Sequence, residues 1–545
     1  MSDDFSDQFA TDELVIGGAG APRRSRRRWI GGGAIGLLAI GGGAAAWAAT
    51  SFFSQGTQPA EALPDSTIGY VSVDLDPSGA QKIAALKLAR KFPAFKDKVG
   101  LQTGDDIRKW IFGKAADGNC DLDFDKQVAP WLGSRAAVAA VGTDHPIPVV
   151  VVQTTDAGKA EAGVKALLSC GGTSADSAGV GWTINGDWIV FAETTEKAKE
   201  VVKETEKGSL ADDPDFQSWT DKAGDSGILT AYAAPAAGQV LAQELGKATD
   251  GGSTFGSASP IDPFGMLGSC PGLSDPSAAT QRMKGQLADF RGAAATLRFG
   301  ADGVELEMVG DTQAFGGSAA TSTPSGTPVV STLPADTAVG IGVSFPQDWT
   351  AQLTKNLQNV CGEGTDPKAL FAPLSRATGL DLPDDLPKLL GDSAALALGP
   401  GIDVEGMVNS GDPSTLPVAL KLRGEKDTID GVAAKLRQTL GAPAGALEPV
   451  AGDGAVAIGL DKAYAEEVAK SGGLGSSDEF RSVVPHGDKS ASVVYVSVNA
   501  LDKAVKALSG GDDEIAANLA PLRAIGLSGW SEDGDGHAVF KVSLD

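Results

Sequence analysis

The densest run of potential metal ligands in this chain lies at residues 117–125. Its oxygen-bearing side chains are Asp117, Asn119, Asp121, Asp123 and Asp125. Alternating carboxylates in a loop are able to converge on Ca²⁺, which prefers oxygen ligands. An EF-hand loop also needs glycine at its sixth position and glutamate at its twelfth, where this chain has Leu122 and Val128. The pattern therefore favours a solvated acidic loop over a metal site.

Residues for acid–base or nucleophilic catalysis are scarce. The histidines are His145, His486 and His537, and the first two adjoin prolines in expected loops, where we interpret them as solvated. Residues 268–272, Gly-Ser-Cys-Pro-Gly, imitate a nucleophile elbow but lack the strand and helix that frame one. Neither a GxxxxGK[ST] phosphate loop nor an HExxH zinc motif occurs. The sequence predicts no catalytic residue, no cofactor and no metal site.

The cysteines are even in number and lie far apart. They are Cys120, Cys170, Cys270 and Cys361. This is typical of structural disulfides in an oxidising compartment, and the spacing excludes a CxxC redox or zinc site. Three pairings are open, and closeness along the chain favours Cys120 with Cys170 and Cys270 with Cys361.

A basic cluster followed by an apolar stretch predicts how the chain meets a membrane. Five arginines between Arg23 and Arg28 precede residues 29–53, which contain no charged side chain. A transmembrane helix needs about 20 apolar residues, and basic residues stay on the cytoplasmic side. We therefore expect a single-pass cell-membrane protein with a cytoplasmic N-terminus and an extracytoplasmic bulk.

A cleaved signal peptide is the alternative interpretation of the same stretch. Residues 25–30 have the form of a twin-arginine signal, and residues 46–48 would serve as a small-residue cleavage site. We favour retention because the apolar run is longer than a usual signal core and ends in aromatic residues. Gly32 and Gly36 form a GxxxG pattern, which would permit a homodimer through close helix packing.

The charge of the chain narrows the class of partner. The formal net charge is −25, and the arginines of the N-terminal tail are balanced by acidic residues there, so the excess is extracytoplasmic. An acidic surface repels phosphate backbones and anionic lipid head groups. We therefore exclude nucleic acid as the main partner, and the charge itself serves solubility.

After the apolar stretch, the chain repeats one pattern of motifs. Residues 63–67, Leu-Pro-Asp-Ser-Thr, recur as residues 333–337, and residues 131–139 recur as residues 389–397. Each copy continues into a helical pattern with apolar residues three, four and seven apart. The helical positions are Ala160, Val164, Leu167 and Leu168 in the first copy, and Ile429, Val432, Leu436 and Leu440 in the second. The simplest interpretation is a tandem duplication.

The turns of the two copies also agree. Asn185-Gly186 and Asp453-Gly454 lie between short apolar runs, and both dipeptides favour the type I′ turn of a β-hairpin. Phe216 corresponds to Phe480, and Tyr232 corresponds to Tyr495. The fold class expected is α+β. It comprises two tandem homologous domains, each a mainly antiparallel sheet with helices on one face, after one N-terminal transmembrane helix.

Composition sets the expected boundaries between these parts. Glycine, serine, threonine and proline dominate the predicted linker, and the predicted stalk has no large apolar residue, so neither segment is expected to build a core. The predicted parts are a cytoplasmic tail at 1–28, a transmembrane helix at 29–53, a stalk at 54–62, outer repeat 1 at 63–310, a linker at 311–332 and outer repeat 2 at 333–545.

The arginine-rich start, the apolar segment, the opening at residues 63–67, the Trp-Leu-Gly at residues 131–133 and the paired repeats together resemble a known family. The chain is similar to actinobacterial proteins grouped as domain of unknown function 3352. The resemblance implies membrane attachment, and it implies no activity and no functional residue.

We expect a non-enzymatic binding or scaffold module of the cell envelope, with an envelope protein or a lipid as its partner. Exposed aromatic rings would support this, and the candidates are Trp110, Trp182, Trp188, Trp219 and Trp349. One alternative is a carrier, which requires an apolar pocket of several hundred Å³. The other is an enzyme with an unrecognised site, which clustered carboxylates with raised pKa values in a cleft would favour.

Overall fold

The computed structural model describes most of the chain from Thr57 onward. The described residues are 57–74, 80–98, 105–116, 122–169, 180–225, 227–250, 284–285, 287–312, 326–361, 365–402, 415–440, 446–501 and 513–545. The cytoplasmic tail and the apolar stretch predicted to cross a membrane lie outside these residues.

In the described part of the chain, sixteen strands form one antiparallel sheet. The first eight are β1 (Thr67–Asp74), β2 (Leu132–Val141), β3 (Ile147–Thr154), β4 (Gly181–Asn185), β5 (Trp188–Ala192), β6 (Leu229–Ala233), β7 (Ala293–Phe299) and β8 (Gly303–Gly310). The second eight are β9 (Val339–Ser344), β10 (Ser393–Leu398), β11 (Val418–Leu422), β12 (Val450–Gly452), β13 (Ala455–Gly459), β14 (Ser492–Ser497), β15 (Leu522–Glu532) and β16 (Asp535–Leu544). The expected α+β class with a mainly antiparallel sheet is confirmed.

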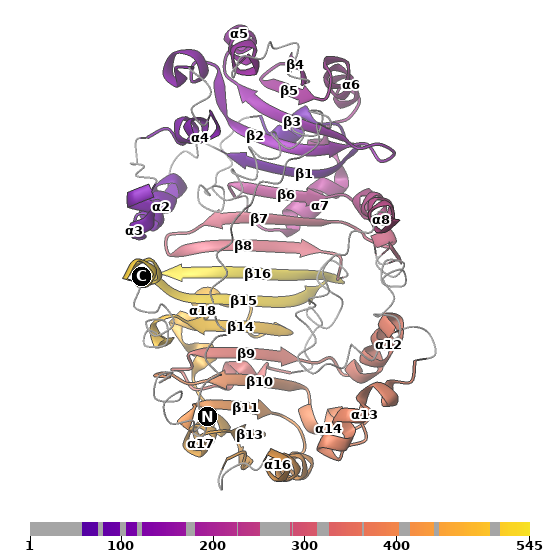
Figure 1. The fold of residues 1–545 in the computed structure, drawn as a ribbon, viewed down its shortest axis with the longest axis vertical. Helices are drawn as coiled ribbons and strands as arrows, with labels where there is room; N and C mark the ends of the chain where they lie inside the picture. Colours follow the sequence, from indigo (N-terminus) through magenta and orange to yellow (C-terminus); the bar gives the residue numbers. More distant parts are fainter. Residues whose placement is uncertain are drawn as a thin grey trace, which may run out of the picture.

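The strand order reads the same outward from the middle of the sheet (Figure 1). The first half runs β8, β7, β6, β1, β2, β3, β5, β4, and the second half runs β16, β15, β14, β9, β10, β11, β13, β12. Each strand of the second half therefore carries a number eight higher than its counterpart. The halves meet where β8 pairs with β16, from Gly303 opposite Ser543 to Gly310 opposite Gly536.

Helices and short helical turns connect the strands. In the first half these are η1 (Pro59–Ala62), α2 (Ala80–Ala89), α3 (Pro93–Lys98), α4 (Ile107–Ala116), η2 (Phe124–Val128), α5 (Ala157–Leu168), α6 (Thr195–Thr205), η5 (Leu210–Asp212), α7 (Pro214–Lys222) and α8 (Pro235–Asp250). In the second half they are η8 (Val329–Thr332), α12 (Trp349–Cys361), α13 (Pro367–Thr378), α14 (Leu386–Leu390), α16 (Lys426–Leu440), α17 (Lys462–Ala469), η10 (Leu474–Ser476), α18 (Asp478–Val483), η11 (Asn499–Leu501) and α20 (Asp513–Leu519).

Local sequence explains several of these boundaries. Gly186 turns from β4 into β5 with a φ of 56°, and Asp453 and Gly454 turn from β12 into β13 with φ values of 44° and 76°. The positive angles of Asp453 and Gly454 are those of the predicted type I′ turn. In the first hairpin Asn185 pairs with Trp188, and of the two central residues only Gly186 has a positive φ, as in a type II′ turn, so the type I′ prediction is wrong there. The side chains of Asp156 and Thr194 accept backbone hydrogen bonds at the starts of α5 and α6, as N-cap residues do.

One face of the sheet, which we call the core face, carries the main hydrophobic core of each half. In the first half Phe216 of α7 packs edge-on against Tyr70 and Tyr232, with ring centroids 5.5 and 5.1 Å apart. In the second half Phe480 of α18 packs against Tyr495 at 5.2 Å. The residues that the sequence matched between the copies thus occupy equivalent places.

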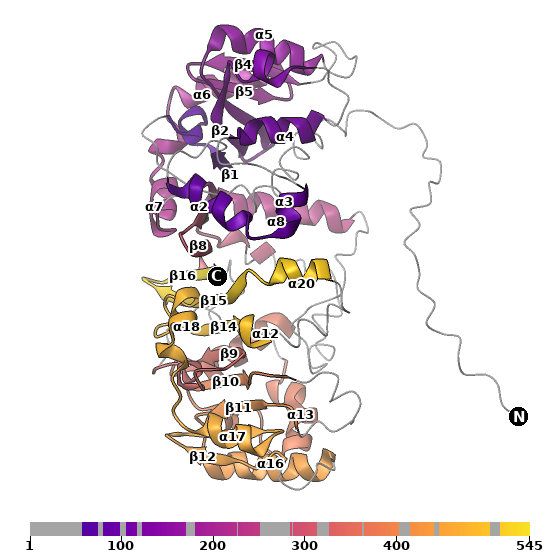
Figure 2. The same cartoon turned by 90° about the vertical axis from the view of Figure 1, so that its left-hand side faces the viewer.

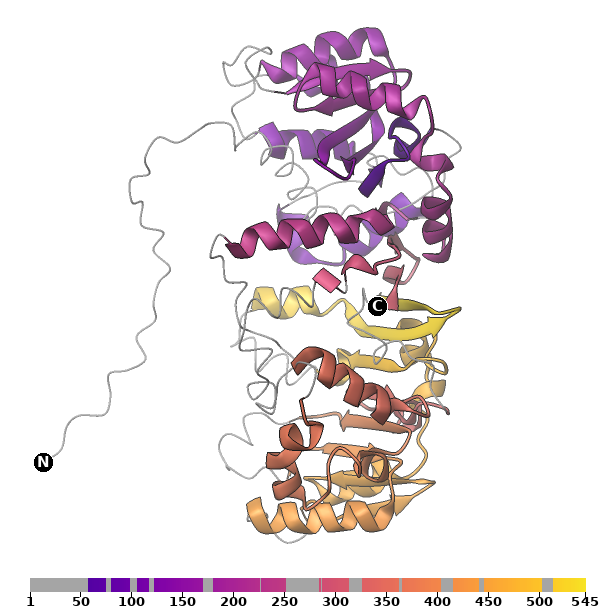
Figure 3. The ribbon, with the colours of Figure 1, turned by 90° about the vertical axis from the view of Figure 1, so that its right-hand side faces the viewer.

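On the opposite face, which we call the groove face, the helices of the described residues pack mainly at the ends and borders. Val164 of α5 packs with Ile189 at one end, and Ile429 of α16 packs with Leu422 at the other. Leu88 of α2 joins residues of β7 and β16. Figure 2 shows α7 on one side of the sheet with α8 and α20 on the other, and Figure 3 shows α8 and α12 projecting to the same side.

The prediction that helices cover one face only is therefore wrong. The sheet exposes aliphatic side chains on both faces, so each face needs cover somewhere along its length. Two segment predictions also differ from the structure. Residues 59–62 of the predicted stalk form η1, with Ala60 and Ala62 buried, and residues 329–332 of the predicted linker form η8, with Val329 and Val330 buried. Both turns pack into the cores of the core face.

Candidate functional site

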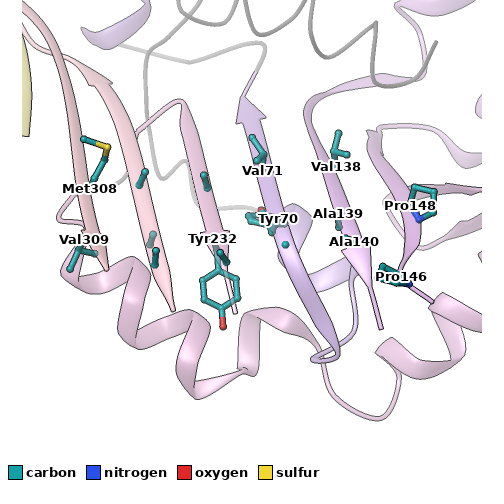
Figure 4. A pocket seen from close by; sticks show the side chains of 16 residues that line it. Tyr70, Val71, Val138, Ala139, Ala140, Pro146, Pro148, Tyr232, Met308 and Val309 are labelled. Carbon is teal, nitrogen blue, oxygen red and sulfur yellow. The ribbon is translucent and has the colours of Figure 1, made fainter. Parts of the chain in front are cut away.

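A groove crosses six strands of the first half on the groove face, with a volume of about 780 Å³. Val71, Val138 and Met308 point into it, whereas Tyr232 points to the opposite side of the sheet (Figure 4). The side chains that line it are aliphatic, aromatic, proline or methionine, and none is charged. The groove is thus suited to apolar matter.

Two rows of side chains running across the strands make the floor. The first floor row is Ala293, Ala233, Gly69, Ala140 and Pro148. The second floor row is Met308, Ala295, Ala231, Val71 and Val138. Each residue in a row stands opposite the next on the neighbouring strand. Most of these side chains are small, and the floor is correspondingly low.

The second half places larger side chains at the corresponding positions. Aligning the halves on Tyr232 and Tyr495 and following the register gives one counterpart for each floor residue. The counterparts of the first row are Ile525, Val496, Val339, Leu398 and Val418, and those of the second row are Phe540, Leu527, Val494, Ile341 and Leu396. The floor in the first half is therefore lower than the corresponding surface of the second half, because its side chains are shorter.

The small floor residues oppose the usual preferences of strands. Alanine and glycine are depleted in β-strands, where β-branched and aromatic residues pack better. The second half shows that this sheet accepts valine, leucine and isoleucine at the same places. Local choices that weaken an element without improving its packing are expected at functional sites. The groove is for this reason our candidate functional site.

A second cavity of about 560 Å³ lies on the core face between β1, β6 and α7. Arg135 donates from Nε to Asp74 Oδ2 at 3.2 Å and from Nη1 to the Thr57 carbonyl at 2.8 Å. Burial raises the pKa of the neighbouring Tyr70 hydroxyl. In the second half, the counterparts of Asp74 and Arg135 are Ser344 and Ser393, whose hydroxyls lie 3.0 Å apart.

The carboxyl groups give no support to acid–base catalysis. Burial alone would raise the pKa of Glu305, but its hydrogen bonds to Lys541 and Arg298 outweigh burial and lower it. The other resolved carboxyl shifts among the described residues are also downward, as at Asp156 beside Lys159 and Glu448 beside Lys462. The clustered carboxylates with raised pKa values that would have favoured an enzyme are not found in the described part of the chain.

The histidines do not share one environment. His145 is exposed in the turn between β2 and β3, as expected. His537 lies in β16, is only 9% exposed and stacks on Trp530 with ring centroids 5.2 Å apart, while His486 contacts the same tryptophan at 4.3 Å. Burial lowers the pKa of both His486 and His537. The interpretation of His486 as a solvated loop residue is wrong, because its ring packs on Trp530.

The acidic loop and the cysteines are described only in part. Asp123 caps η2 and pairs with Lys126, and Asp125 pairs with Lys109. Within the described residues, no three His, Cys, Asp or Glu side chains gather as a metal site would require. Cys361 is buried at the end of α12 and bonded in a disulfide. Residues 117–121, 268–272 and the other three cysteines lie outside the described residues, so their pairing stays a prediction.

The tryptophans proposed as exposed rings are not fully exposed. Trp188 and Trp219 are buried, and Trp110, Trp182 and Trp349 are half-buried. The burial of these tryptophans weakens the argument from exposed aromatic rings for a protein partner.

Within the described ranges, none of the helices combines the length and apolar character needed to cross a bilayer.

A family model described as "Protein of unknown function (DUF3352)" matches residues 30–416. The chain belongs to this family. The match covers the whole first half with its groove and continues into the second half as far as the connection before β11, and the DUF3352 description names no activity. No curated protein and no solved structure gives a significant match.

Reasoning from single motifs missed the groove, although the signal was present in the repeat. Ala231, Tyr232 and Ala233 correspond to Val494, Tyr495 and Val496, so a conserved tyrosine is flanked by alanine in one copy and valine in the other. The same contrast recurs on neighbouring strands, and only the register shows that these positions adjoin.

Proposed function

We propose that this DUF3352 protein is a non-enzymatic binding protein that carries an apolar ligand in the groove over β8, β7, β6, β1, β2 and β3. The single observation behind the proposal is the hollow of about 780 Å³ with an uncharged lining. Ligand sites are concave, mostly apolar and commonly about 300–1,000 Å³ in volume.

The proposal also includes membrane attachment through residues 29–53, with the bulk of the chain extracytoplasmic. The arginines before this stretch and its apolar composition support it. An anchor of this kind would hold the groove close to a source of apolar ligands. That each half is a separate homologous domain is part of the same proposal, supported by the shared strand order.

The test is photolabelling of the full-length protein in nanodiscs with a diazirine-bearing fatty acid, with empty nanodiscs as background. A filling variant carries Ala231→Val, Ala295→Leu and Met308→Phe, which are the residues of the second half. The control variant makes the reverse type of change outside the groove, Val494→Ala and Leu527→Ala. Thermal melts and circular dichroism verify that both variants fold.

We expect the filling variant to lose most of the label, because its larger side chains occupy the hollow. The control variant keeps the wild-type level of labelling. Equal labelling of wild type and of a correctly folded filling variant would refute the proposal, as would an absence of label above background in the wild type.

A further inference from the structure

The shape of the groove limits which apolar ligand it accepts. Neighbouring strands lie about 4.8 Å apart, so a groove from β8 to β3 is about 24 Å long. The two floor rows are two residues apart along each strand, a distance of about 7 Å. The hollow is therefore more than three times longer than the spacing of its floor rows, and its long axis runs across the strands.

The volume and length together give the mean cross-section. A volume of about 780 Å³ over a length of about 24 Å corresponds to a cross-section of about 30 Å². A packed β-strand occupies more, about 48 Å², from the strand spacing and the roughly 10 Å between stacked sheets. The mean cross-section of the groove is therefore smaller than that of a packed peptide strand.

The lining recognises no head group. It contains no charged side chain. A ligand with a polar end must leave that end in solvent, because an unpaired charge over this apolar floor would lose its hydration without compensation. Recognition therefore rests on the apolar part of the ligand alone.

We propose that the occupant is a single unbranched acyl chain lying across β8, β7, β6, β1, β2 and β3 along the two floor rows. This rests on the proposed function and names its ligand class. The groove is longer than the roughly 15 Å that one leaflet contributes to a hydrocarbon core of about 30 Å. It accommodates a long chain in an extended conformation.

The experiment is competition against the photolabel by unlabelled competitors on the full-length protein in nanodiscs. Straight-chain fatty acids of increasing length should compete with about fourfold higher affinity per added methylene, from about 0.8 kcal/mol per buried CH₂. The gain ends once the extended chain exceeds about 24 Å. The fatty alcohol of equal length should compete equally, and a sterol should not compete.

A variant at the end of the groove supplies a second readout. Met308 lies on β8, the last strand of the groove, and Met308→Trp should fill only that end. We expect the affinity gain to stop at a shorter chain length than in the wild type, while short chains bind unchanged. A loss of binding at all lengths, or an unchanged limit, would contradict the extended orientation.

The outcomes separate the two proposals. Absence of specific labelling defeats the proposed function itself. Labelling that a sterol displaces as well as a long fatty acid does, or that shows no dependence on chain length, leaves a binding groove but overturns the acyl chain as its occupant.

Discussion

Lys421 of β11 carries a buried amine, and measuring stability against pH tests this burial. It is 1% exposed, and its Nζ donates to the carbonyl oxygens of Thr332 and Lys470 at 3.0 and 2.8 Å. These bonds tie η8 and the end of α17 to the sheet. Burial lowers the pKa of the Lys421 amine to about 8. Its counterpart in the first half by register is Val151, which is fully buried.

The lowered pKa makes stability depend on pH in a defined direction. Between pH 8 and about 10.5 the unfolded chain holds the Lys421 proton more tightly than the folded chain, so the free energy of unfolding rises with pH. A difference of about 2.5 units at 1.36 kcal/mol each amounts to about 3 kcal/mol over this range. Below pH 8 both states are protonated and this contribution is constant.

The assay is urea denaturation of the wild type and of Lys421→Met at pH 7, 8, 9 and 10. Other groups titrate in this range, so the quantity compared is the difference between the two proteins. The variant lacks the buried amine but leaves two carbonyls without a donor, at about 1–3 kcal/mol each. We expect the wild type to gain about 2.5 kcal/mol over the variant from pH 7 to pH 10.

Lys199→Met, at an exposed position of α6, is the control and should leave the pH profile unchanged. Parallel pH profiles for the wild type and Lys421→Met would refute the reasoning, because they would show that Lys421 titrates alike in the folded and unfolded chains.

Three further predictions concern the scaffold. Gly391→Val should unfold the second half, because Gly391 has a φ of 67° and a Cβ there would lie 2.4 Å from the Arg423 carbonyl oxygen. The control is Gly454→Ala, at a φ of 76° in open space, which should lower the free energy of unfolding by only about 1–2 kcal/mol in denaturation experiments. His537→Ala should lower the free energy of unfolding by about 1 kcal/mol through loss of the ring contact with Trp530. The wild type should lose stability as the pH falls below 6.5, and the variant should lose less. Equal effects of His145→Ala, at an exposed position, would contradict this. Limited proteolysis should cut first between residues 315 and 327. The two fragments should still co-elute after disulfide reduction, because β8 and β16 remain paired. Fragments that separate after reduction without denaturant would contradict the β8–β16 pairing.

Elements set by local sequence were predictable. The two hairpins were predicted from their turn dipeptides, and Gly186 and Gly454 supply a positive φ in each. The helices α5 and α16 follow from apolar spacing on one helix face. Membership of the DUF3352 family was also predicted from motifs and is confirmed.

Features that depend on residues far apart in the sequence could not be predicted from local sequence patterns. The β8–β16 seam joins residues more than 200 positions apart, and nothing in either strand's alternation specifies the other as partner. The packing of α2 on the groove face was missed because its apolar residues give little contrast between helix faces. The groove itself depends on side-chain sizes compared across six strands, which requires the register. The alanines of any single strand, taken alone, do not indicate a groove.

The central claim is that the first half binds an apolar chain in the groove across β8 to β3. The most direct measurement is a crystal structure of the protein with a long-chain fatty acid that carries bromine, located by anomalous scattering. We predict bromine peaks over the two floor rows, close to Ala231, Ala295 and Val71. An empty groove, with bromine bound only over the Ile341, Leu527 and Phe540 side chains of the second half or elsewhere, would contradict the claim.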